Sequence, residues 1–413
     1  MGFLNRLKNY YHLLTATFFA VFYRFPSRKL TLIGVTGTDG KTTTVNLIYH
    51  LLKGAGKKVS MVSSVNAIIG EKAYDTGFHV TTPDPSNVQK YLRQAVDAGC
   101  QYFVLESTSH GLAQNRLFGC FFKIGVVTNI THEHLDYHKS YQSYLTAKAK
   151  LFDKVKTAVL NKDDQSYSYL EKICKNRKCL TYSLKDKADF NLTNFPFKTG
   201  LLGDYNLSNC LAAAAIVSSL GVDQKTIQEG LASFRGLVGR LENINEGQDF
   251  KVIVDFAHTP NALTRVLQFL KKEKSKTGKL IAVFGAAGLR DIQKRFLMGE
   301  VSGRLADITI LTAEDPRTED VNKIIEKMAQ GCLKADCQEL KIDQIDKTRE
   351  GKRFFFRIPD RGKAIEFAVQ KIAKKGDVVV ICGKGHERSM CYGKTEYPWS
   401  DQKAATQALK NKK

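Results

Sequence analysis

The segment that most constrains the fold of this chain is a glycine-rich turn between a strand pattern and a helix pattern. The apolar run at 30–35, Leu-Thr-Leu-Ile-Gly-Val, is typical of a buried strand, and the run at 45–52, Val-Asn-Leu-Ile-Tyr-His-Leu-Leu, is typical of a helix. Between them, at 37–44, lies Gly-Thr-Asp-Gly-Lys-Thr-Thr-Thr. This order predicts a phosphate-binding loop, because glycines let backbone N–H groups surround phosphate oxygens and the helix N-terminus adds its dipole.

Two side chains of this loop are suited to nucleotide chemistry. We expect Lys41 to reach the outer phosphates and the Thr42 hydroxyl to ligate Mg²⁺. The pattern is shorter than a strict Walker A motif, which would need glycine where Val35 stands. A glycine-rich turn without a ligand is the alternative, but a Lys-Thr pair at the start of the helix favours phosphate binding.

The rest of the chain predicts a two-domain α/β protein. A length of 413 residues exceeds one ordinary domain, and 43% hydrophobic with 25% charged residues is typical of a soluble globular protein. Strand-like apolar runs alternate with helical patterns, which indicates parallel sheets. We predict an apolar and basic N-terminal helix over 1–29, a central P-loop ATPase domain with a parallel sheet over 30–236, and a Rossmann-like C-terminal α/β domain over 237–413.

The formal net charge of +22 does not identify a partner by itself. The sequence contains no nucleic-acid recognition motif, so we expect no nucleic-acid partner. An acidic substrate, an anionic membrane surface or solubility explains the charge equally well. The nine cysteines lack the spacing of metal sites, and a reducing cytoplasm fits them.

The N-terminal segment is apolar, aromatic and flanked by basic residues. Residues 9–23 carry no charge, a run shorter than the roughly 20 apolar residues that a membrane-spanning helix needs. Arg6 and Lys8 precede this run, and Arg24, Arg28 and Lys29 follow it. The pattern is compatible with a helix at the inner face of a membrane, in peripheral contact through residues 3–25. A helix packed on the protein's own core is the equal alternative.

Five further segments, taken with the phosphate loop, resemble the Mur ligases. They are Thr-Thr-Pro-Asp at 81–84, Glu-Ser-Thr-Ser-His at 106–110, Thr-His-Glu-His-Leu-Asp-Tyr-His at 131–138, Ala-Lys-Ala-Lys-Leu-Phe at 147–152 and Asp-Phe-Ala-His-Thr-Pro at 255–260. Each is weak alone, but their order is specific, and the resemblance covers residues 30 to about 390. It points to the MurE-type branch, the UDP-N-acetylmuramoyl-tripeptide synthetases.

The resemblance implies ATP and Mg²⁺ as cofactors. The implied ATP-binding residues are Gly37, Thr38, Asp39, Gly40, Lys41, Thr42, Thr43, Asn206, Arg240, Asp255, His258 and Lys294. Glu106 follows one apolar strand and His134 follows another, where both suit a divalent ion, although imidazole is softer than Mg²⁺ usually takes. With Thr42, and with Lys148 as a carbamate, they are the implied Mg²⁺ ligands. Lys148 matches the family's lysine that carries a carbamate (N6-carboxylysine); an unmodified surface lysine is the alternative.

The same resemblance implies the two other substrate sites. Thr81, Thr82, Ser109 and Arg116 are the implied contacts of a muramoyl-peptide acceptor. Arg290, Glu314, Asp315, Arg317, Gly383 and Glu387 are the implied contacts of the incoming amino acid. In the family, the arginine of a D-N-P-R motif selects meso-diaminopimelate by pairing with its extra carboxylate. Arg317 keeps that arginine, but Glu314-Asp315 replaces Asp-Asn, so L-lysine stays open as the alternative.

We therefore expect a monomeric ADP-forming ligase with Lys41, Glu106, His134 and Lys148 as its catalytic residues. The expected reaction joins a diamino acid to the D-Glu carboxylate of UDP-MurNAc-L-Ala-D-Glu through an acyl phosphate, in peptidoglycan precursor synthesis. Only residues 1–29 precede the loop strand, whereas the family carries an N-terminal uridine-nucleotide domain there. A lipid-linked acceptor is therefore one alternative, and a non-catalytic ATP-binding scaffold is another.

Overall fold

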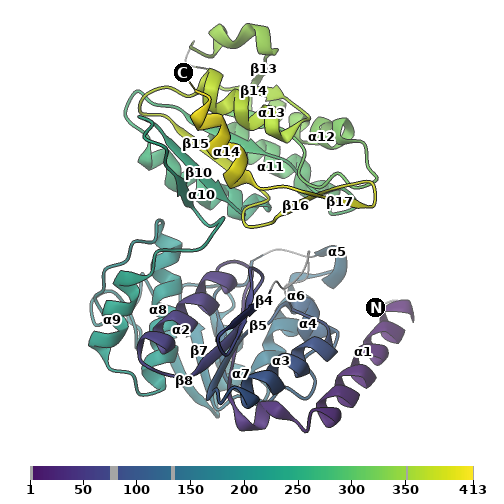
Figure 1. Cartoon of the computed structure of the whole chain (residues 1–413), viewed down its shortest axis with the longest axis vertical. Helices are drawn as coiled ribbons and strands as arrows, with labels where there is room; N and C mark the ends of the chain where they lie inside the picture. Colours follow the sequence, from purple (N-terminus) through teal and green to yellow (C-terminus); the bar gives the residue numbers. More distant parts are fainter. Residues whose placement is uncertain (1–2, 75–81, 132–134, 350–351, 413) are drawn as a thin grey trace. The chain divides into compact units, whose positions relative to one another are not determined.

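The computed structural model describes residues 3–74, 82–131, 135–349 and 352–412 (Figure 1). They form two compact units, Met1–Arg235 and Gly236–Lys413. Each unit is a sheet covered by helices, which confirms the predicted α/β class with a P-loop domain and a second α/β domain.

The first unit contains an eight-stranded sheet in the order β4-β3-β2-β5-β1-β6-β7-β8. Its strands are β1 (Thr31–Thr36), β2 (Val59–Val62), β3 (Ala67–Ile69), β4 (Lys72–Tyr74), β5 (Tyr102–Glu106), β6 (Phe122–Val127), β7 (Thr157–Asn161) and β8 (Lys178–Tyr182). The six strands from β2 to β8 along this order are parallel, and β3 and β4 add an antiparallel edge. Central β1 is buried because helices cover both faces of the sheet, which explains its unbroken apolar run.

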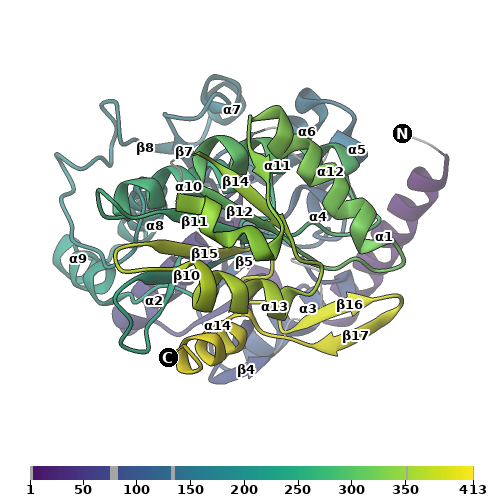
Figure 2. The ribbon, with the colours of Figure 1, turned by 90° about the horizontal axis from the view of Figure 1, so that it is seen from above.

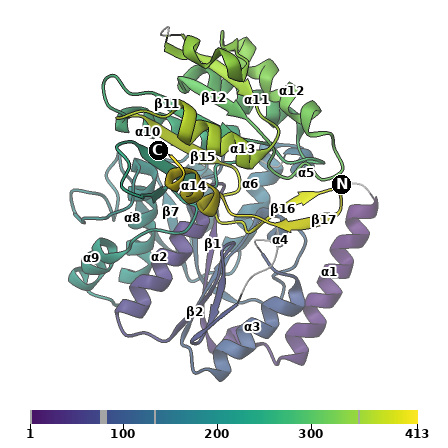
Figure 3. The ribbon, with the colours of Figure 1, turned by 45° about the horizontal axis from the view of Figure 1, so that its top comes forward.

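The helices of the first unit follow the strands in βα order. They are α1 (Phe3–Phe22), α2 (Lys41–Gly54), α3 (Pro85–Asp97), α4 (Ser109–Ala113), α5 (Leu135–His138), α6 (Tyr141–Ala149), α7 (Tyr167–Cys174), α8 (Asp204–Ser219) and α9 (Gln224–Ser233). Figure 3 shows α1 lying along α3. The alanine-rich middle of α8 is fully buried and packs against α2, because small side chains let the two helices approach closely. In the part of the chain that the structure describes, no helix is both long and apolar enough to cross a membrane.

The second unit contains a seven-stranded sheet in the order β13-β14-β12-β11-β15-β10-β9. Its strands are β9 (Glu242–Ile244), β10 (Lys251–Asp255), β11 (Leu280–Phe284), β12 (Ile308–Leu311), β13 (Gln338–Glu339), β14 (Phe354–Arg357) and β15 (Val378–Cys382), and β16 (Ser389–Tyr392) with β17 (Thr395–Pro398) forms a separate hairpin. All neighbours in the sheet are parallel except β9, which runs antiparallel to β10.

Helices cover both faces of this second sheet. Figure 2 shows α10 (Pro260–Glu273), α11 (Ile292–Leu305) and α12 (Val321–Lys334) on one face, with α13 (Arg361–Glu366) and α14 (Asp401–Lys410) on the other. Ser400 caps α14 by accepting a hydrogen bond from the Lys403 N–H at 3.2 Å. This cap fixes the start of α14, where the buried Asp401 lies.

The contact between α11 and α12 depends on glycines. An alanine in their place would force the two helices apart. A Cβ built at Gly331 would lie 2.0 Å from the Phe296 carbonyl oxygen, and one at Gly299 would lie 1.9 Å from the Met328 carbonyl oxygen. The two backbones therefore touch directly, which a larger side chain would prevent.

We predict opposite effects for two helical glycine-to-alanine changes. G331A should lower the free energy of unfolding by about 1–3 kcal/mol, because the new methyl group must separate two packed helices. G54A, at the end of α2 with no atom within 4 Å of the added Cβ, should leave stability unchanged or raise it by up to about 1 kcal/mol. Urea denaturation followed by circular dichroism measures both, and equal effects would contradict the packing argument.

Candidate functional site

The glycine-rich turn forms a loop whose backbone is held by the segment after β6. The Asp39 N–H donates to Asn129 Oδ1 at 3.0 Å, and the Asp39 carbonyl oxygen accepts from Thr128 Oγ1 at 2.6 Å. Gly37 lies so close to Thr128 that a Cβ there would be 1.8 Å from Oγ1. Gly40 has a φ of 82°, in the left-handed region that favours glycine, and directly precedes α2. The loop conformation is thus fixed by the protein itself, as a phosphate cradle requires.

Two residues predicted to bind ATP, Lys41 and Asn206, lie at or near this loop. The Lys41 ammonium donates to the Thr38 carbonyl oxygen at 2.7 Å, so it folds back over the turn. Asn206 reaches the loop through Asn209, whose Nδ2 donates to Asn206 Oδ1 at 3.0 Å. The Asn209 side chain in turn touches Gly40, where a Cβ would lie 2.3 Å from Oδ1.

Thr42 and Glu106, both predicted magnesium ligands, are in direct contact. Thr42 Oγ1 lies 3.2 and 3.1 Å from the two oxygens of the Glu106 carboxylate. Ser64 holds the same carboxylate, through its N–H at 2.9 Å and its hydroxyl at 3.0 Å. Glu106 is 1% exposed. An oriented carboxylate beside a hydroxyl at a phosphate loop offers the hard oxygen ligands that Mg²⁺ prefers, so the donor set fits the ion.

Lys148 is buried at the same loop. It extends from α6, its side chain is 1% exposed, and its ammonium donates to the Gly37 carbonyl oxygen at 2.5 Å. The ammonium also lies 4.4 Å from the centre of the Tyr144 ring, and the Tyr144 hydroxyl contacts Thr38 Oγ1 at 3.2 Å. A lysine in this position is not a solvated surface residue.

Two predicted residues, His134 and Thr81, lie outside the described residues. Within the described ranges, no group of three or more His, Cys, Asp or Glu side chains gathers as a metal site. The predicted ion site combines the Glu106 carboxylate, the Thr42 hydroxyl and Lys148 as a carbamate. A further predicted ligand, His134, lies in the part not described.

The remaining residues predicted to contact the acceptor lie just beyond β5. Thr82 is buried, and its hydroxyl contacts the Glu106 carbonyl oxygen at 3.1 Å. Arg116 donates to the Thr82 carbonyl oxygen at 3.1 Å. Ser109 begins α4, and its hydroxyl lies 3.0 Å from His138 Nε2. These residues therefore share one edge of the sheet with the candidate Mg²⁺ ligands.

In the second unit, Asp255 ends β10 and organises the neighbouring backbone. Its carboxylate accepts from the Leu241 N–H and the Ala257 N–H at 2.7 and 2.8 Å. Gly239 has a φ of 68° and packs so closely on the 385–386 backbone that a Cβ would lie 2.2 Å from the His386 nitrogen. Asp255 and Gly239 thus fix the loop that carries Arg240.

Arg240, Phe256, His258 and His386 form one aromatic and cationic cluster. The Arg240 guanidinium lies 4.5 Å from the centre of the Phe256 ring, which contacts both histidine rings. Burial lowers the pKa of His258 to about 3, and the nearby Lys294 charge adds to this shift. His258 is therefore neutral at physiological pH and can serve a nucleotide only as a hydrogen-bonding group.

Lys294 and its neighbour Arg295 have different surroundings. Lys294 is half-buried on α11 near His258 and Glu314. Arg295 is buried and paired with Glu319 at 2.8 Å, and it also donates to the Ala287 carbonyl oxygen at 3.2 Å. Arg295 is therefore a structural residue of the 285–291 loop. Lys294, which is predicted to bind ATP, lies near His258 and Glu314.

The segment after β12 places Glu314 and Asp315 in different environments. Asp315 accepts from the Lys384 ammonium at 2.8 Å and from the Cys391 N–H at 2.9 Å. Glu314 is 6% exposed, and its Oε2 has no hydrogen-bond partner among the residues that the structure describes. Burial raises the pKa of the Glu314 carboxyl, and Glu387 and Asp315 add to the rise against the opposing lysines. Glu314 is therefore the acidic group that can meet a ligand cation, whereas Asp315 bonds to Lys384 and to the Cys391 N–H.

Lys384 is the buried cation that compensates this acidic segment. It lies 2.8 Å from Asp315 and 2.5 Å from Glu387, and its side chain is inaccessible to solvent. Burial alone would lower its pKa, but the two carboxylates outweigh that effect and raise it. Gly383 has a φ of 112° and brings the backbone against Glu314, where a Cβ would lie 3.2 Å from Oε2.

Arg317 follows this segment with a strained backbone. Its φ is 53°, and its N–H and carbonyl oxygen bond to Cys391 and Gly393 at 3.0 and 2.8 Å. Its guanidinium makes no ion pair with any carboxylate whose position is described. Arg290, in the loop after β11, is exposed. Both arginines can therefore bind a ligand carboxylate without breaking an internal ion pair.

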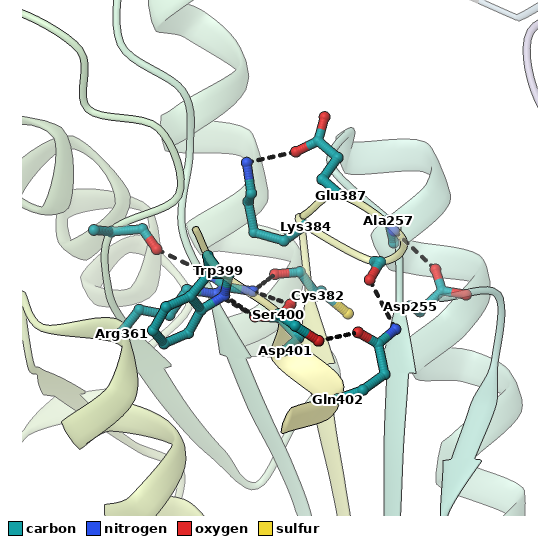
Figure 4. Close-up of polar contacts among 12 residues, drawn as sticks. Asp255, Ala257, Arg361, Cys382, Lys384, Glu387, Trp399, Ser400, Asp401 and Gln402 are labelled. Carbon is teal, nitrogen blue, oxygen red and sulfur yellow. Dashed lines mark hydrogen bonds and ion pairs between the residues drawn. The ribbon is translucent and has the colours of Figure 1, made fainter. Parts of the chain in front are cut away.

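A buried ion pair holds together the two segments that carry predicted amino-acid contacts, the one after β12 and the one after β15 (Figure 4). Arg361 donates to Asp401 at 2.7 and 2.6 Å, and to the carbonyl oxygens of Ala313 and Cys382 at 3.0 and 2.9 Å. These carbonyls directly precede Glu314 and Gly383. Trp399 Nε1 also donates to Asp401, at 2.8 Å. One guanidinium thus fixes the spacing of the ends of β12 and β15.

Comparison of the sequence with protein families identifies the family of this chain. Profiles for the Mur ligase middle domain and for the Mur ligase, glutamate ligase domain match residues 35–217 and 239–385. The chain belongs to the Mur ligase family. This confirms the resemblance predicted from the motifs, and members of this family are ligases.

Relatives within the Mur ligase family agree with one another. The chain is 37% identical over 425 residues to UDP-N-acetylmuramyl-tripeptide synthetase of Roseiflexus sp. (strain RS-1), covering 94% of this chain and 80% of that protein. It is 36% identical over 423 residues to UDP-N-acetylmuramoyl-L-alanyl-D-glutamate--2,6-diaminopimelate ligase of Geobacillus thermodenitrificans (strain NG80-2), covering 95% and 81%. A solved structure of a ligase with the latter name has a TM-score of 0.61 at 32% identity, over 92% of this chain and 78% of that one.

Sequence reasoning missed several residues of this Mur ligase site. Ser64 and Asn129 follow β2 and β6, and a polar residue after an apolar run was the available signal for both. Asn209 lies one helical turn from Asn206. Arg361 carried no local signal, because its partner Asp401 lies 40 residues away in the sequence.

We predict that removing Arg361 costs far more than removing an exposed arginine. R361M leaves the buried Asp401 carboxylate without its cation, which should lower the free energy of unfolding by about 3–5 kcal/mol. R304M breaks an exposed pair with Glu300 on α11 and should cost less than about 1 kcal/mol. Chemical denaturation measures both. The double variant R361M/D401L should be more stable than R361M, and a double variant that loses the sum of both single effects would contradict the pairing.

We predict that the His258 imidazole stays neutral as the pH falls from 7 to 5. Its pKa of about 3 lies below the usual 6.5, so the folded protein binds that proton only in strong acid, and stability falls as the pH drops below about 6.5. NMR of the histidine-labelled full chain tests this, with H258Q identifying the resonance. A midpoint near 6.5 would contradict the burial argument.

Proposed function

We propose that this chain is an ATP-dependent, ADP-forming amide ligase of peptidoglycan precursor synthesis. It adds meso-diaminopimelate to the D-Glu carboxylate of UDP-MurNAc-L-Ala-D-Glu. The observation that carries the proposal is the contact of Thr42 with Glu106 at a preformed phosphate loop, with Lys148 buried beside it. The named diaminopimelate ligase of Geobacillus thermodenitrificans, at 36% identity, supports the substrate assignment.

In the first step, the acceptor carboxylate attacks the γ-phosphate of ATP and releases ADP. The loop N–H groups from Gly37 to Thr43 bind the phosphates, and Lys41 moves from the Thr38 carbonyl oxygen to the transferring group. Thr42 and Glu106, with His134 by family resemblance, would hold Mg²⁺. A bound Mg²⁺ supplies charge neutralisation between the phosphates and the attacking carboxylate.

Lys148 is proposed to carry the carbamate of an N6-carboxylysine. An ammonium at this position would repel a nearby divalent ion, whereas a carbamate offers anionic oxygens to it. Lys148 is 1% exposed, and its Nζ lies 2.5 Å from the Gly37 carbonyl oxygen of the phosphate loop. The buried position of Lys148 beside the loop therefore supports the modification.

In the second step, the amine of the incoming amino acid attacks the acyl phosphate, which gives the amide and releases phosphate. Thr82, Ser109 and Arg116 are proposed to hold the muramoyl peptide, with Thr81 by family resemblance. By family resemblance, Asn206, Arg240, Asp255, His258 and Lys294 are proposed as ATP-binding residues. Asp255 also holds the neighbouring backbone by accepting from the Leu241 and Ala257 N–H groups.

Selection of the amino acid is proposed to use opposite charges. Arg317 would pair with the extra carboxylate of meso-diaminopimelate, and Glu314 would accept an amine. Arg290, in the separate 288–291 segment, is proposed as a further contact of the amino acid. Asp315, Gly383 and Glu387 would shape this pocket through Lys384. L-Lysine keeps the distal amine but lacks the carboxylate, so it remains the competing substrate.

We place the protein in the cytoplasm, in peripheral contact with the inner face of a membrane through residues 3–25. A monomer suffices for the reaction, and no nucleic acid takes part. A lipid-linked muramoyl peptide is the competing acceptor, and a non-catalytic ATP-binding scaffold is the competing role.

Phosphate release from ATP tests the reaction. With UDP-muramoyl-L-alanyl-D-glutamate present, release should depend on meso-diaminopimelate and be slower with L-lysine. R317L should lower kcat/KM for meso-diaminopimelate by about 10- to 100-fold, the loss of one charge-assisted pair, and leave L-lysine unaffected. K41M should lower kcat by about 100-fold or more.

The other outcomes separate the alternatives. Preference for L-lysine that is insensitive to R317L would assign the enzyme to lysine. Turnover only with a lipid-linked acceptor would replace the nucleotide acceptor. ATP binding without turnover on any acceptor would support the role of a non-catalytic ATP-binding scaffold.

A further inference from the structure

Helix α1 packs on the first unit through a narrow face of small residues. Ala16 and Ala20 are fully buried and His12 is 8% exposed. These three residues are four apart, so they lie on one side of the helix. That side faces α3, and a Cβ built at Gly119 would lie 2.6 Å from the Ala20 methyl group. The inner face of α1 is therefore already occupied by the protein's own core.

The outer face of α1 is apolar, unlike the outer face of an ordinary surface helix. Among the side chains described from Asn9 to Phe22, those classed as exposed are all hydrophobic or aromatic. They are Tyr10, Tyr11, Leu14, Phe18, Val21 and Phe22, each between 57% and 70% exposed. Their spacing of three to four residues makes a continuous stripe opposite the buried alanines.

Two threonines in the described part of this helix bond to its own backbone. Thr15 and Thr17 are half-buried, and their hydroxyls donate to the carbonyl oxygens of Tyr11 and Leu13, both at 2.8 Å. A surface helix in water normally shows the reverse distribution, with charged residues outward. The solvent side of α1 is therefore built for an apolar environment.

Cations and two further aromatic rings extend this stripe at the C-terminal end of α1. The Arg28 guanidinium lies 4.6 Å from the Phe25 ring centre and 4.8 Å from the Phe121 ring centre. Phe121 and Phe118, in the loop that packs on Ala20, are 38% and 48% exposed. Arg24 and Lys29 are exposed at the same end.

The charge of this segment has one sign. The sequence from Met1 to Thr38 contains no Asp or Glu, and it contains Arg6, Lys8, Arg24, Arg28 and Lys29. Aromatic side chains prefer the boundary between lipid headgroups and acyl chains, and nearby cations bind anionic headgroups.

We propose that the outer face of α1, with Phe118, Phe121, Arg24, Arg28 and Lys29, is a docking surface for an anionic lipid bilayer. The helix lies in the plane of the interface with its aromatic stripe toward the acyl chains. Charge complementarity selects this occupant over a second copy of the chain, since a second α1 would bring further cations and no carboxylate. The inference makes the proposed membrane placement specific, and it does not depend on the ligase reaction.

Vesicle flotation of the full chain tests the surface. Binding should be strong to phosphatidylglycerol-containing vesicles and weak to vesicles of phosphatidylcholine alone. F18S/F22S should weaken binding by about tenfold or more for each ring, because each exposed phenyl group loses its burial in lipid. R24Q/R28Q should weaken it by about fivefold for each cation, and high salt should have the same effect on the wild-type protein.

Matched variants on the second unit provide the controls. L333S removes an exposed apolar side chain from α12, and K271Q/K272Q removes two exposed cations from α10. Both should bind vesicles as the wild type does. Phosphate release from ATP with soluble substrates should persist in every variant, so loss of binding with retained turnover separates this inference from the ligase proposal.

Two results would overturn the proposal. One is vesicle binding that ignores lipid charge and the α1 substitutions. The other is a stable dimer in sedimentation that F18S/F22S dissociates, which would assign the stripe to a second copy of the chain.

Discussion

Parallel strands impose the constraint from which both candidate sites follow. In a parallel sheet every carboxyl end lies at one edge, and the backbone groups that leave this edge need new hydrogen-bond partners. In the first unit, the segment after β6 supplies those partners to the phosphate loop after β1. In the second unit, Arg361 supplies them to the ends of β12 and β15. Polar side chains gather at these edges because the backbone groups there need hydrogen-bond partners.

Buried charge at these edges is stable only because each charge is compensated. Arg361 pairs with Asp401, and Lys384 pairs with Asp315 and Glu387. Such pairs contribute little net stability compared with apolar side chains, since desolvation offsets most of the attraction. These pairs fix geometry instead. Separating the partners would leave a buried charge without compensation, so the segments that carry them keep one spacing. A ligase that must align three substrates depends on that spacing.

The sequence predicted the α/β class and the family, because strand periodicity, the glycine-rich turn and the order of motifs are local signals. It also placed Thr42, Glu106 and Lys148 at strand and helix ends that the structure brings together. It did not reveal Arg361, whose partner is distant in the chain, or the different environments of Glu314 and Asp315, which depend on Lys384. For α1 the sequence left two alternatives open, and the helix does pack on the core through its alanines. The orientation of its aromatic residues required the three-dimensional packing.

The charges of the segment at 314–317 indicate which residue could distinguish meso-diaminopimelate from L-lysine. Lys384 neutralises Asp315 and Glu387, so the buried Glu314 is the carboxyl left to meet an incoming amine. Its raised pKa means that the anion is costly until a cation arrives, and an ammonium group would supply one. Both meso-diaminopimelate and L-lysine carry such an amine, so Glu314 favours diamino acids without separating them. Only the extra carboxylate separates them, and Arg317 is suited to bind it. Under the proposed function, we therefore expect the arginine, and not the acidic replacement beside it, to decide between meso-diaminopimelate and L-lysine.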